Sequence, residues 1–297
     1  MHHSLNIIGR LPYHLYTLWL FNRNDMKTMV LPSIVFSYFQ FPNATTTVFL
    51  TRLPLMLTYT WFNLLAFTIN NQCHQGAVSE DALNKPWRPI PAKRITHIQA
   101  VSLGAATIPV AIGISAILGG GMAQSILLAA LGMIYNSFGG SNSHWLLRNA
   151  LNAAGFTCFA SGTLEVAIQS SLPRSLTPRL CLIFLVVCST VHSQDMYDQA
   201  GDAAAGRRTL PLVIGDARAR ACIAVVVCFW SVAVCPLYWF FATGMQRVMF
   251  LGPLGLGTWI CVRILRSRGV QDDRVTFRVY NAWLASLYAL PTYDAKG

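Results

Sequence analysis

Acidic side chains are few in this chain and concentrated at two places. Among its 11 aspartates and glutamates, Glu80 and Asp81 form a first cluster, and Asp195, Asp198 and Asp202 form a second. Each cluster lies at the end of a long apolar stretch and is followed by lysine or arginine. Carboxylates are the ligands that Mg²⁺ shares with substrate phosphates, and ionisable groups beside membrane spans are functional candidates. The pattern therefore favours a site for a divalent metal and a phosphorylated ligand.

The second cluster has the spacing of a helix. Asp195, Asp198 and Asp202 are three and four residues apart, which places all three on one face of a helix that continues the preceding apolar span. Like charges this close repel one another, so a cation must lie near them. Arg207 and Arg208 are one source of that charge and a bound metal is the other. The presence of two acidic clusters, each trailed by basic residues, favours the metal.

The first cluster precedes a basic, proline-rich segment. Three prolines between residues 86 and 91 prevent a regular helix there, so we expect Glu80 and Asp81 on a loop at the mouth of a helical bundle. Such a segment suits phosphate oxygens, although anchoring to lipid headgroups would explain it equally well. Its cations are Lys85, Arg88, Lys93 and Arg94.

Composition places both clusters in a membrane protein. With 54% hydrophobic residues, 11% charged residues and a mean hydropathy of +0.46, the chain has too little polar surface to cover a soluble globule. Because a spanning helix needs about 20 mostly apolar residues, we expect an all-α polytopic bundle of about nine transmembrane helices. The expected spans are 26–42, 45–70, 97–118, 121–138, 146–168, 178–197, 219–242, 245–264 and 275–292.

Membrane topology accounts for the net charge of +11. With nine spans, the amino terminus and every second loop share one face, which collects most of the 22 lysines and arginines. The positive-inside rule places that face, and with it both acidic clusters, in the cytosol. The charge therefore gives no reason to invoke nucleic acid. The sequence indicates the lipid bilayer as surroundings and points to no obligate protein partner.

Two motifs carry a resemblance to a known family. Asp-x-x-Asn-Lys-Pro-x-Arg-Pro runs from Asp81 to Pro89, and Asp-x-x-Asp-x-x-Gly-Asp-x-Ala-x-Gly-Arg-Arg-Thr-Leu runs from Asp195 to Leu210. Together with the nine-span plan and Lys27-Thr28, they resemble the paired aspartate motifs of the UbiA superfamily of intramembrane prenyltransferases. The resemblance covers essentially the whole chain.

The resemblance implies a single transmembrane domain over residues 1–297, with a central cavity under a cytosolic cap. There Mg²⁺ would bridge the two acidic clusters to the diphosphate of a prenyl substrate. The expected metal ligands are Glu80, Asp81, Asp195, Asp198 and Asp202, and the four aspartates are also the expected catalytic residues. The expected diphosphate-binding residues are Asn71, Lys85, Arg88, Arg94, Arg148, Arg207 and Arg208. The expected cavity residues are Tyr135, Asn136, Asn149 and Tyr197.

The first motif departs from the family pattern. Counting back from Asp81 places Ala77 and Cys73 where the family has a second aspartate and an asparagine. Either a short insertion lets Asn71, Gln72 and Glu80 take over those roles, or the first metal site is reduced. This form of the motif, together with segments 135–140 and 144–149, is similar to a fungal branch that includes UbiA-type terpene cyclases.

Three functions remain open from the sequence. If a prenyl diphosphate ionises with no acceptor bound, its cation must be captured by a double bond of its own chain in a dry apolar cavity. We favour such a Mg²⁺-dependent terpene cyclase, acting on farnesyl diphosphate in secondary metabolism in the endoplasmic reticulum membrane. Prenyl transfer to an aromatic or other small acceptor is the alternative. A lipid or small-molecule transporter is a remote alternative. Transport carboxylates are expected near the bilayer midplane, whereas the acidic clusters of this chain are expected at the cytosolic ends of the spans.

Overall fold

The computed structural model describes residues 2–41, 45–74, 76–239, 245–267 and 269–290. Every regular element in these ranges is helical, which confirms the expected all-α class. The helices are α1 (His2–Asn22), η1 (Met26–Val30), α2 (Leu31–Gln40), α3 (Thr46–Cys73), α4 (Ala77–Asn84), α5 (His97–Ile117), α6 (Met122–Asn136), α7 (Gly140–Ser143), α8 (Trp145–Ile168), η2 (Arg174–Leu176), α9 (Thr177–Thr190), η3 (Val191–Ser193), α10 (Asp195–Ala204), α11 (Leu210–Ile214), α12 (Asp216–Trp239), α13 (Met245–Val248), α14 (Leu251–Arg266) and α15 (Val270–Tyr288).

Four segments of the described chain are long and apolar enough to cross a membrane. They are His97–Ile117, Trp145–Ile168, Arg174–Ser193 and Asp216–Val234. α6 is also apolar but has only 15 residues. These segments support an integral membrane protein, while the expected count of nine spans stays a prediction. The expected spans 26–42, 219–242 and 275–292 end at residues outside the described ranges.

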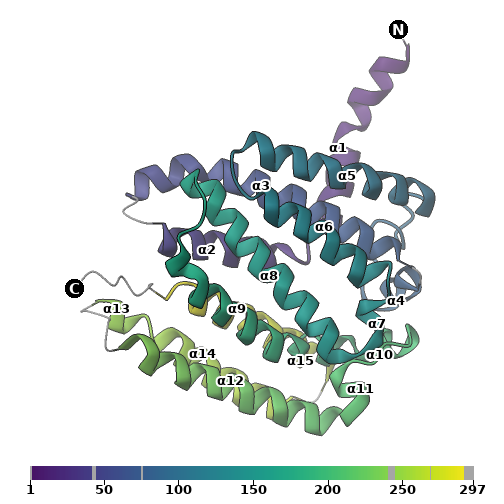
Figure 1. Cartoon of the computed structure of the whole chain (residues 1–297). Coiled ribbons are helices and arrows are strands. Elements are labelled where there is room, and N and C mark those ends of the chain that lie inside the picture. The colour runs from purple at the N-terminus through teal and green to yellow at the C-terminus, as the bar shows by residue number, and fades with distance from the viewer. Residues whose placement is uncertain (1, 42–44, 75, 240–244, 268, 291–297) are drawn as a thin grey trace.

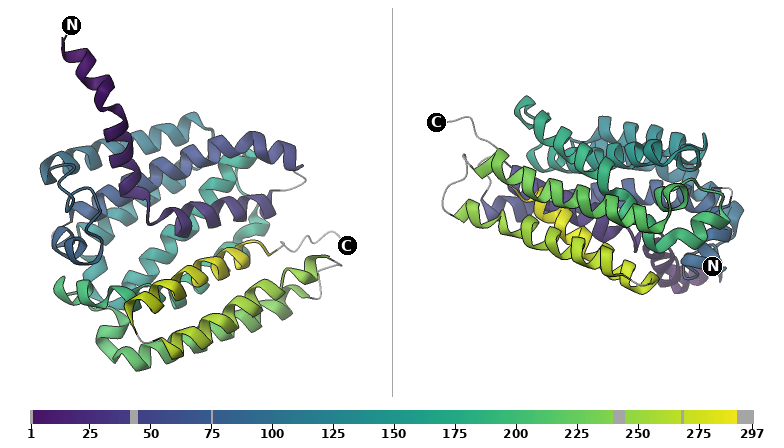
Figure 2. Two further views of the ribbon diagram at one scale, coloured as in Figure 1. Left: turned by 180° about the vertical axis from the view of Figure 1, so that it is seen from behind. Right: turned by 90° about the horizontal axis from the view of Figure 1, so that it is seen from below.

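The long helices lie side by side in a bundle (Figures 1 and 2). α8 contacts α2, α3, α6 and α9, and α12, α14 and α15 pack against one another in chain order. α15 also contacts α2, so the last helix meets the first helices of the bundle. The main apolar core lies among these elements and includes Leu164, Val187, Ile223 and Trp283, all of which are buried. This packing sets the positions of the helix ends from which the polar segments of the chain extend.

Four short helices gather at one end of the bundle, namely α4, α7, α10 and α11 (Figure 1). Both acidic clusters lie in this group, because α4 carries Glu80 and Asp81 and α10 carries the three aspartates of the second cluster. α4 and α10 are in contact although more than a hundred residues separate them in the chain. The bundle therefore delivers both clusters to one place.

The expectation of a loop at Glu80 and Asp81 was wrong. The proline block begins only at Pro86, so the preceding residues are free to form α4, which starts after Gly76 in the left-handed region at φ +85°. The second cluster also lies on a helix of its own, because the 3₁₀ turn η3 interrupts the path from α9 to α10.

The sequence did not predict α1, which projects from the bundle (Figures 1 and 2). Arg94 contacts the second half of α1. The guanidinium donates to Thr17 Oγ1 at 3.1 Å and to the carbonyl of Tyr13 at 3.0 Å, and it lies 4.0 Å from the centre of the Tyr13 ring. Cation–π contact and hydrogen bonds thus join the basic segment after α4 to α1.

Candidate active site

Glu80 and Asp81 of the first cluster and Asp198 of the second line one space. Asp195 and Asp202 do not line it but pair with its arginines, and we call the space together with these two acids the charged chamber. The volume of the space is about 70 Å³. Asp81 from α4 and Asp198 from α10 both line it, so the two motifs that lie far apart in sequence share one chamber. The ionisable residues that line it are Asp25, Glu80, Asp81, Lys85, Arg88, Arg148, Asp198 and Arg207.

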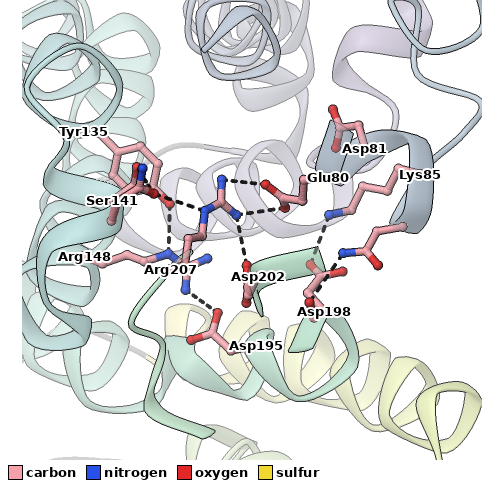
Figure 3. A network of polar contacts seen from close by, with 12 residues as sticks. Glu80, Asp81, Lys85, Tyr135, Ser141, Arg148, Asp195, Asp198, Asp202 and Arg207 are labelled. Carbon is pink, nitrogen blue, oxygen red and sulfur yellow. Dashed lines mark hydrogen bonds and ion pairs between the residues drawn. The ribbon is translucent and has the colours of Figure 1, made fainter. Parts of the chain in front are cut away.

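Two cations from the segment after the first cluster bind aspartates of the chamber. Arg88 donates to both carboxylate oxygens of Asp81, at 2.7 and 2.9 Å. Lys85 reaches across to the second cluster and pairs with Asp198 Oδ2 at 3.0 Å (Figure 3). The Lys85–Asp198 pair is thus a direct bridge between the two motifs.

Two arginines from other parts of the chain complete the network (Figure 3). Arg207 pairs with Glu80 at 2.8 Å and with Asp202 at 3.0 Å, so it also joins both clusters. Arg148 on α8 pairs with Asp195, and its Nε donates to the hydroxyl of Tyr135 at 3.2 Å. Arginine pairing, left open by the sequence, therefore does occur, and Arg207 rather than Arg208 provides it at the second cluster.

Two glycines help to bring the acids and the arginines of this network together. Gly206, with φ +67°, ends α10 and turns the chain so that Arg207 returns to the helix it follows. Gly201 lies where α10 meets α4: a Cβ there would be 2.0 Å from Asn84 Nδ2 and 3.0 Å from Glu80 Cγ. The absence of a side chain at Gly201 leaves room for the side chains of Asn84 and Glu80 between the two acid-bearing helices.

The acids of the chamber are deeply buried. Asp81 and Asp198 are 1% and 4% exposed. Burial raises the pKa of Glu80 above its usual value, and the neighbouring Arg207 only partly opposes this shift. Burial likewise raises the pKa of Asp202, against the pull of Arg148 and Arg207. The cations of the chain therefore do not fully compensate the carboxylates for the loss of water.

Three carboxylate oxygens of the second cluster have no hydrogen-bond partner although they are buried. They are Asp195 Oδ2, Asp198 Oδ1 and Asp202 Oδ2. Buried acceptors are normally satisfied, so each of these oxygens lacks the cation or donor that would compensate its burial. Within the described ranges no three acidic, histidine or cysteine side chains are already arranged as a metal-ligand set. Mg²⁺ nevertheless prefers carboxylate oxygens as ligands, and each of the three aspartates provides one such oxygen.

Several expected site residues do lie at the chamber. Asn71 and Tyr135 line it, while Tyr197 lines a wider opening next to it, of about 270 Å³, together with Lys27, Arg274 and Arg278. Asp25, Lys85, Arg88 and Asp198 line both spaces. The chamber thus continues into an outer, strongly basic pocket.

Other expected site residues lie elsewhere. Arg94 is bound to α1 as described above, and Arg208 is exposed. Gln72 donates to the carbonyl of Phe21 at 3.1 Å instead of facing the acids. Asn149 is buried beside His192, with Asn149 Nδ2 and His192 Nδ1 3.2 Å apart. Asn136 lines a different cavity between α3, α5 and α6.

The structure also adds residues that the sequence reading missed. Asp25 ends the turn between α1 and η1 and lines both the chamber and the outer pocket, and burial raises its pKa. Gln194, directly before α10, lines both as well. The polar run Arg23-Asn24-Asp25, just before the first expected span, was the available signal for Asp25.

An apolar recess adjoins the chamber. Met29, Phe67, Tyr135 and Asn152 line both spaces, and the recess continues between α6 and α8. The walls added there include Leu128, Leu131, Leu151 and Phe159. The site therefore combines a charged end, able to hold an anionic group, with a small apolar recess of about 20 Å³.

Comparisons with known proteins agree with this arrangement. Fumagillin beta-trans-bergamotene synthase of Aspergillus fumigatus is 25% identical over 96% of this chain and 95% of its own length. Polyprenyl transferase eriF of Hericium erinaceus is 26% identical over 98% of this chain and 99% of its own. Somaliensene A/B synthase of Streptomyces somaliensis is 26% identical, covering 93% of both chains.

Among solved structures, a UbiA homolog from Archaeoglobus fulgidus bound to GPP and Mg²⁺ has the same fold. It superimposes with a TM-score of 0.68 at 14% identity, over 92% of this chain and 98% of that one. The sequence profile of the UbiA prenyltransferase family matches residues 28–287. The chain described here is therefore a member of the UbiA prenyltransferase family, an integral membrane enzyme of the terpene cyclase or prenyltransferase type.

Proposed function

We propose that this enzyme binds a prenyl diphosphate in the charged chamber, ionises it with the help of Mg²⁺ and cyclises the resulting allylic cation. Farnesyl diphosphate is the favoured substrate. The observation that carries the proposal is the convergence of Asp81 and Asp198 on one chamber that has basic residues at its mouth and an apolar recess beside it.

The unpartnered oxygens of Asp195, Asp198 and Asp202 support a role in holding Mg²⁺, with Glu80 and Asp81 facing them from α4. Bound there, Mg²⁺ would act as a Lewis acid that stabilises the departing diphosphate. The UbiA homolog from Archaeoglobus fulgidus that has the same fold was bound to Mg²⁺.

The residues of the chain would position the substrate around that step. Lys85, Arg88 and Arg207 present fixed cations to the diphosphate oxygens, and the basic outer pocket guides an anion toward them. Phe67, Tyr135 and Phe156 present aromatic rings to the chamber, where they stabilise a carbocation by cation–π attraction. The apolar recess would contact the hydrocarbon chain and exclude water from that contact.

Prenyl transfer remains the second candidate. It is favoured by the similarity to polyprenyl transferase eriF, which equals the similarity to the two synthases. Transfer would use the same ionisation and differ only in holding an acceptor near the cation.

We further propose that the enzyme resides in the endoplasmic reticulum membrane with both acidic clusters facing the cytosol. The excess of lysine and arginine on that side of the expected topology supports this orientation.

The test uses membranes containing the full chain, farnesyl diphosphate and Mg²⁺, with every acceptor omitted. Hydrocarbon product detected by gas chromatography supports the cyclase. Turnover that begins only when a phenolic compound is added supports the transferase instead. Absence of diphosphate release under both conditions, and with geranylgeranyl diphosphate as well, would contradict the proposed ionisation.

A further inference from the structure

A second cavity lies between α3, α5 and α6, away from the acids. It measures about 270 Å³, close to the lower end of the range for small-molecule pockets, about 300 to 1,000 Å³. We call it the neutral cavity, because no aspartate, glutamate, lysine or arginine is among the described residues that line it. Its walls include Asn63, Phe67, Asn70, Leu128, Gly132 and Asn136.

Asn136 is the unusual group in this cavity. It is only 4% exposed, and neither its amide nitrogen nor its amide oxygen has a hydrogen-bond partner. The other two asparagines differ, because Asn63 donates to the Tyr59 carbonyl at 3.0 Å and Asn70 to the Ala66 carbonyl at 2.7 Å. A buried amide that is unsatisfied on both sides calls for a ligand that offers one donor and one acceptor.

The lining decides the class of ligand. A hydroxyl group supplies one donor and one acceptor, which complements the amide of Asn136. A charged ligand is disfavoured, since a buried ion needs a counter-charge, the described lining supplies no acid, lysine or arginine, and burial lowers the pKa of His74, which also lines the cavity. Ile108, Leu128 and Met133 offer apolar contact to a hydrocarbon body. We propose that the neutral cavity is a second ligand site, which binds an uncharged molecule with a hydrocarbon body and a hydroxyl group.

The neutral cavity shares a wall with the charged chamber. Phe67 lines both, and its ring centre lies 6.0 Å from that of Tyr135. Tyr135 in turn precedes Asn136 and accepts a hydrogen bond from Arg148. A ligand on Asn136 therefore lies directly behind the aromatic partition of the chamber, where either an acceptor or an isoprenoid alcohol could be held.

Binding of radiolabelled farnesol to the full chain in phosphatidylcholine nanodiscs tests the site. We expect saturable binding that Mg²⁺ with inorganic pyrophosphate does not displace. Asn136→Leu should weaken it by about tenfold or more, which corresponds to about 1.4 kcal/mol. Displacement of farnesol by 4-propylphenol would identify a phenol as the ligand class, and its failure would identify the isoprenoid alcohol.

A second variant guards against misfolding of Asn136→Leu. A Cβ at Gly132 would meet only Phe67 Cδ2, at 3.8 Å, so Gly132→Leu fills the cavity without a backbone clash. It should also abolish farnesol binding. Gly113→Leu is the matched control, because a Cβ at Gly113 on α5 meets no atom within 4 Å and the residue does not line the cavity. Wild-type binding in Gly132→Leu, no saturable binding at all, or displacement by pyrophosphate would overturn the proposal.

Discussion

The charged chamber and the neutral cavity are neighbours that treat buried polar groups in opposite ways. In the chamber, acids from α4 and α10 are paired with Lys85, Arg88, Arg148 and Arg207, although one oxygen of each second-cluster aspartate remains without a partner. In the neutral cavity, Asn136 has no partner, and no aspartate, glutamate, lysine or arginine is among the described lining residues. Burying an uncompensated charge costs more free energy than burying an unpaired neutral amide. The stability of the chamber therefore depends on its ion pairs, whereas the neutral cavity tolerates an amide without hydrogen bonds. The comparison predicts different responses to mutation.

The largest effect is expected at the arginine that joins both clusters. Arg207→Leu leaves Glu80 and Asp202 buried without their partner, which should lower the stability by about 3 to 5 kcal/mol. Thermal unfolding of the purified protein in detergent measures this loss. Arg208→Leu is the matched control, since Arg208 is exposed and its removal should change stability by less than about 0.5 kcal/mol. Equal melting temperatures for the two variants would remove the distinction between chamber and surface.

The next effect concerns turnover. Asp198→Asn keeps the shape of the side chain but removes a charge from the chamber, and we expect diphosphate release to slow by about 100- to 1,000-fold. Asp216→Asn provides the comparison, because Asp216 is an aspartate whose side chain is 49% exposed and pairs with Arg220 outside the chamber. Its turnover should stay near that of the wild type. A similar loss in both variants would show that the charge acts on folding instead of on the reaction.

The acids of the chamber also predict a response to pH. Their raised pKa values mean that the folded protein holds protons on Glu80 and Asp202 more tightly than the unfolded chain does. Their contribution to stability therefore falls as the pH rises from the unfolded pKa through the folded one.

Mg²⁺ needs the deprotonated acids, so it should raise the melting temperature more at about pH 8 than at about pH 5. Glu80→Gln should reduce this difference, and Asp216→Asn should leave it unchanged. Thermal unfolding with and without Mg²⁺ at both pH values measures the effect. An increase that is independent of pH would mean that the ion binds outside the chamber.

The smallest effect is expected in the neutral cavity. Asn136→Leu removes a buried amide that no protein group satisfies, so stability should stay the same or rise slightly, by less than about 1 kcal/mol. Asn149→Leu is the contrasting variant, because Asn149 lies within hydrogen-bond distance of His192. It should lower the melting temperature. A marked loss of stability in Asn136→Leu would mean that the amide already has a partner in the folded protein.

The sequence allowed the convergence of the two clusters to be predicted, because their types, spacing and position at span ends all pointed to one site. It did not allow α4 to be predicted, because the three prolines favoured a loop although the residues before Pro86 can form a helix. Arg94 was expected to bind the diphosphate because of the resemblance to the UbiA superfamily. Contacts with Tyr13 and Thr17, 81 and 77 residues away in the chain, decide its position, and no local pattern reports them.

The same limit applies to Asn136 and Asp25. Asn136 was expected to line the substrate cavity, and only packing shows that it lines the neutral cavity, behind Phe67 and Tyr135. Asp25 was missed because it stands alone in the sequence, and the turn after α1 brings it to the chamber. Residues in clusters can be read from the sequence, whereas single residues acquire a function through the tertiary fold.

The missing side chain at Gly201 adds a steric contribution to the spacing of α4 and α10, beside the ion pairs of Lys85 and Arg207. A graded series at this position, from alanine to valine to leucine, would widen this spacing stepwise while every ionisable group of the protein is retained. Electrostatics and spacing, which change together in most active-site variants, could then be varied one at a time. The width at which turnover stops would measure how far apart the two halves of the catalytic apparatus can be and still act on one molecule.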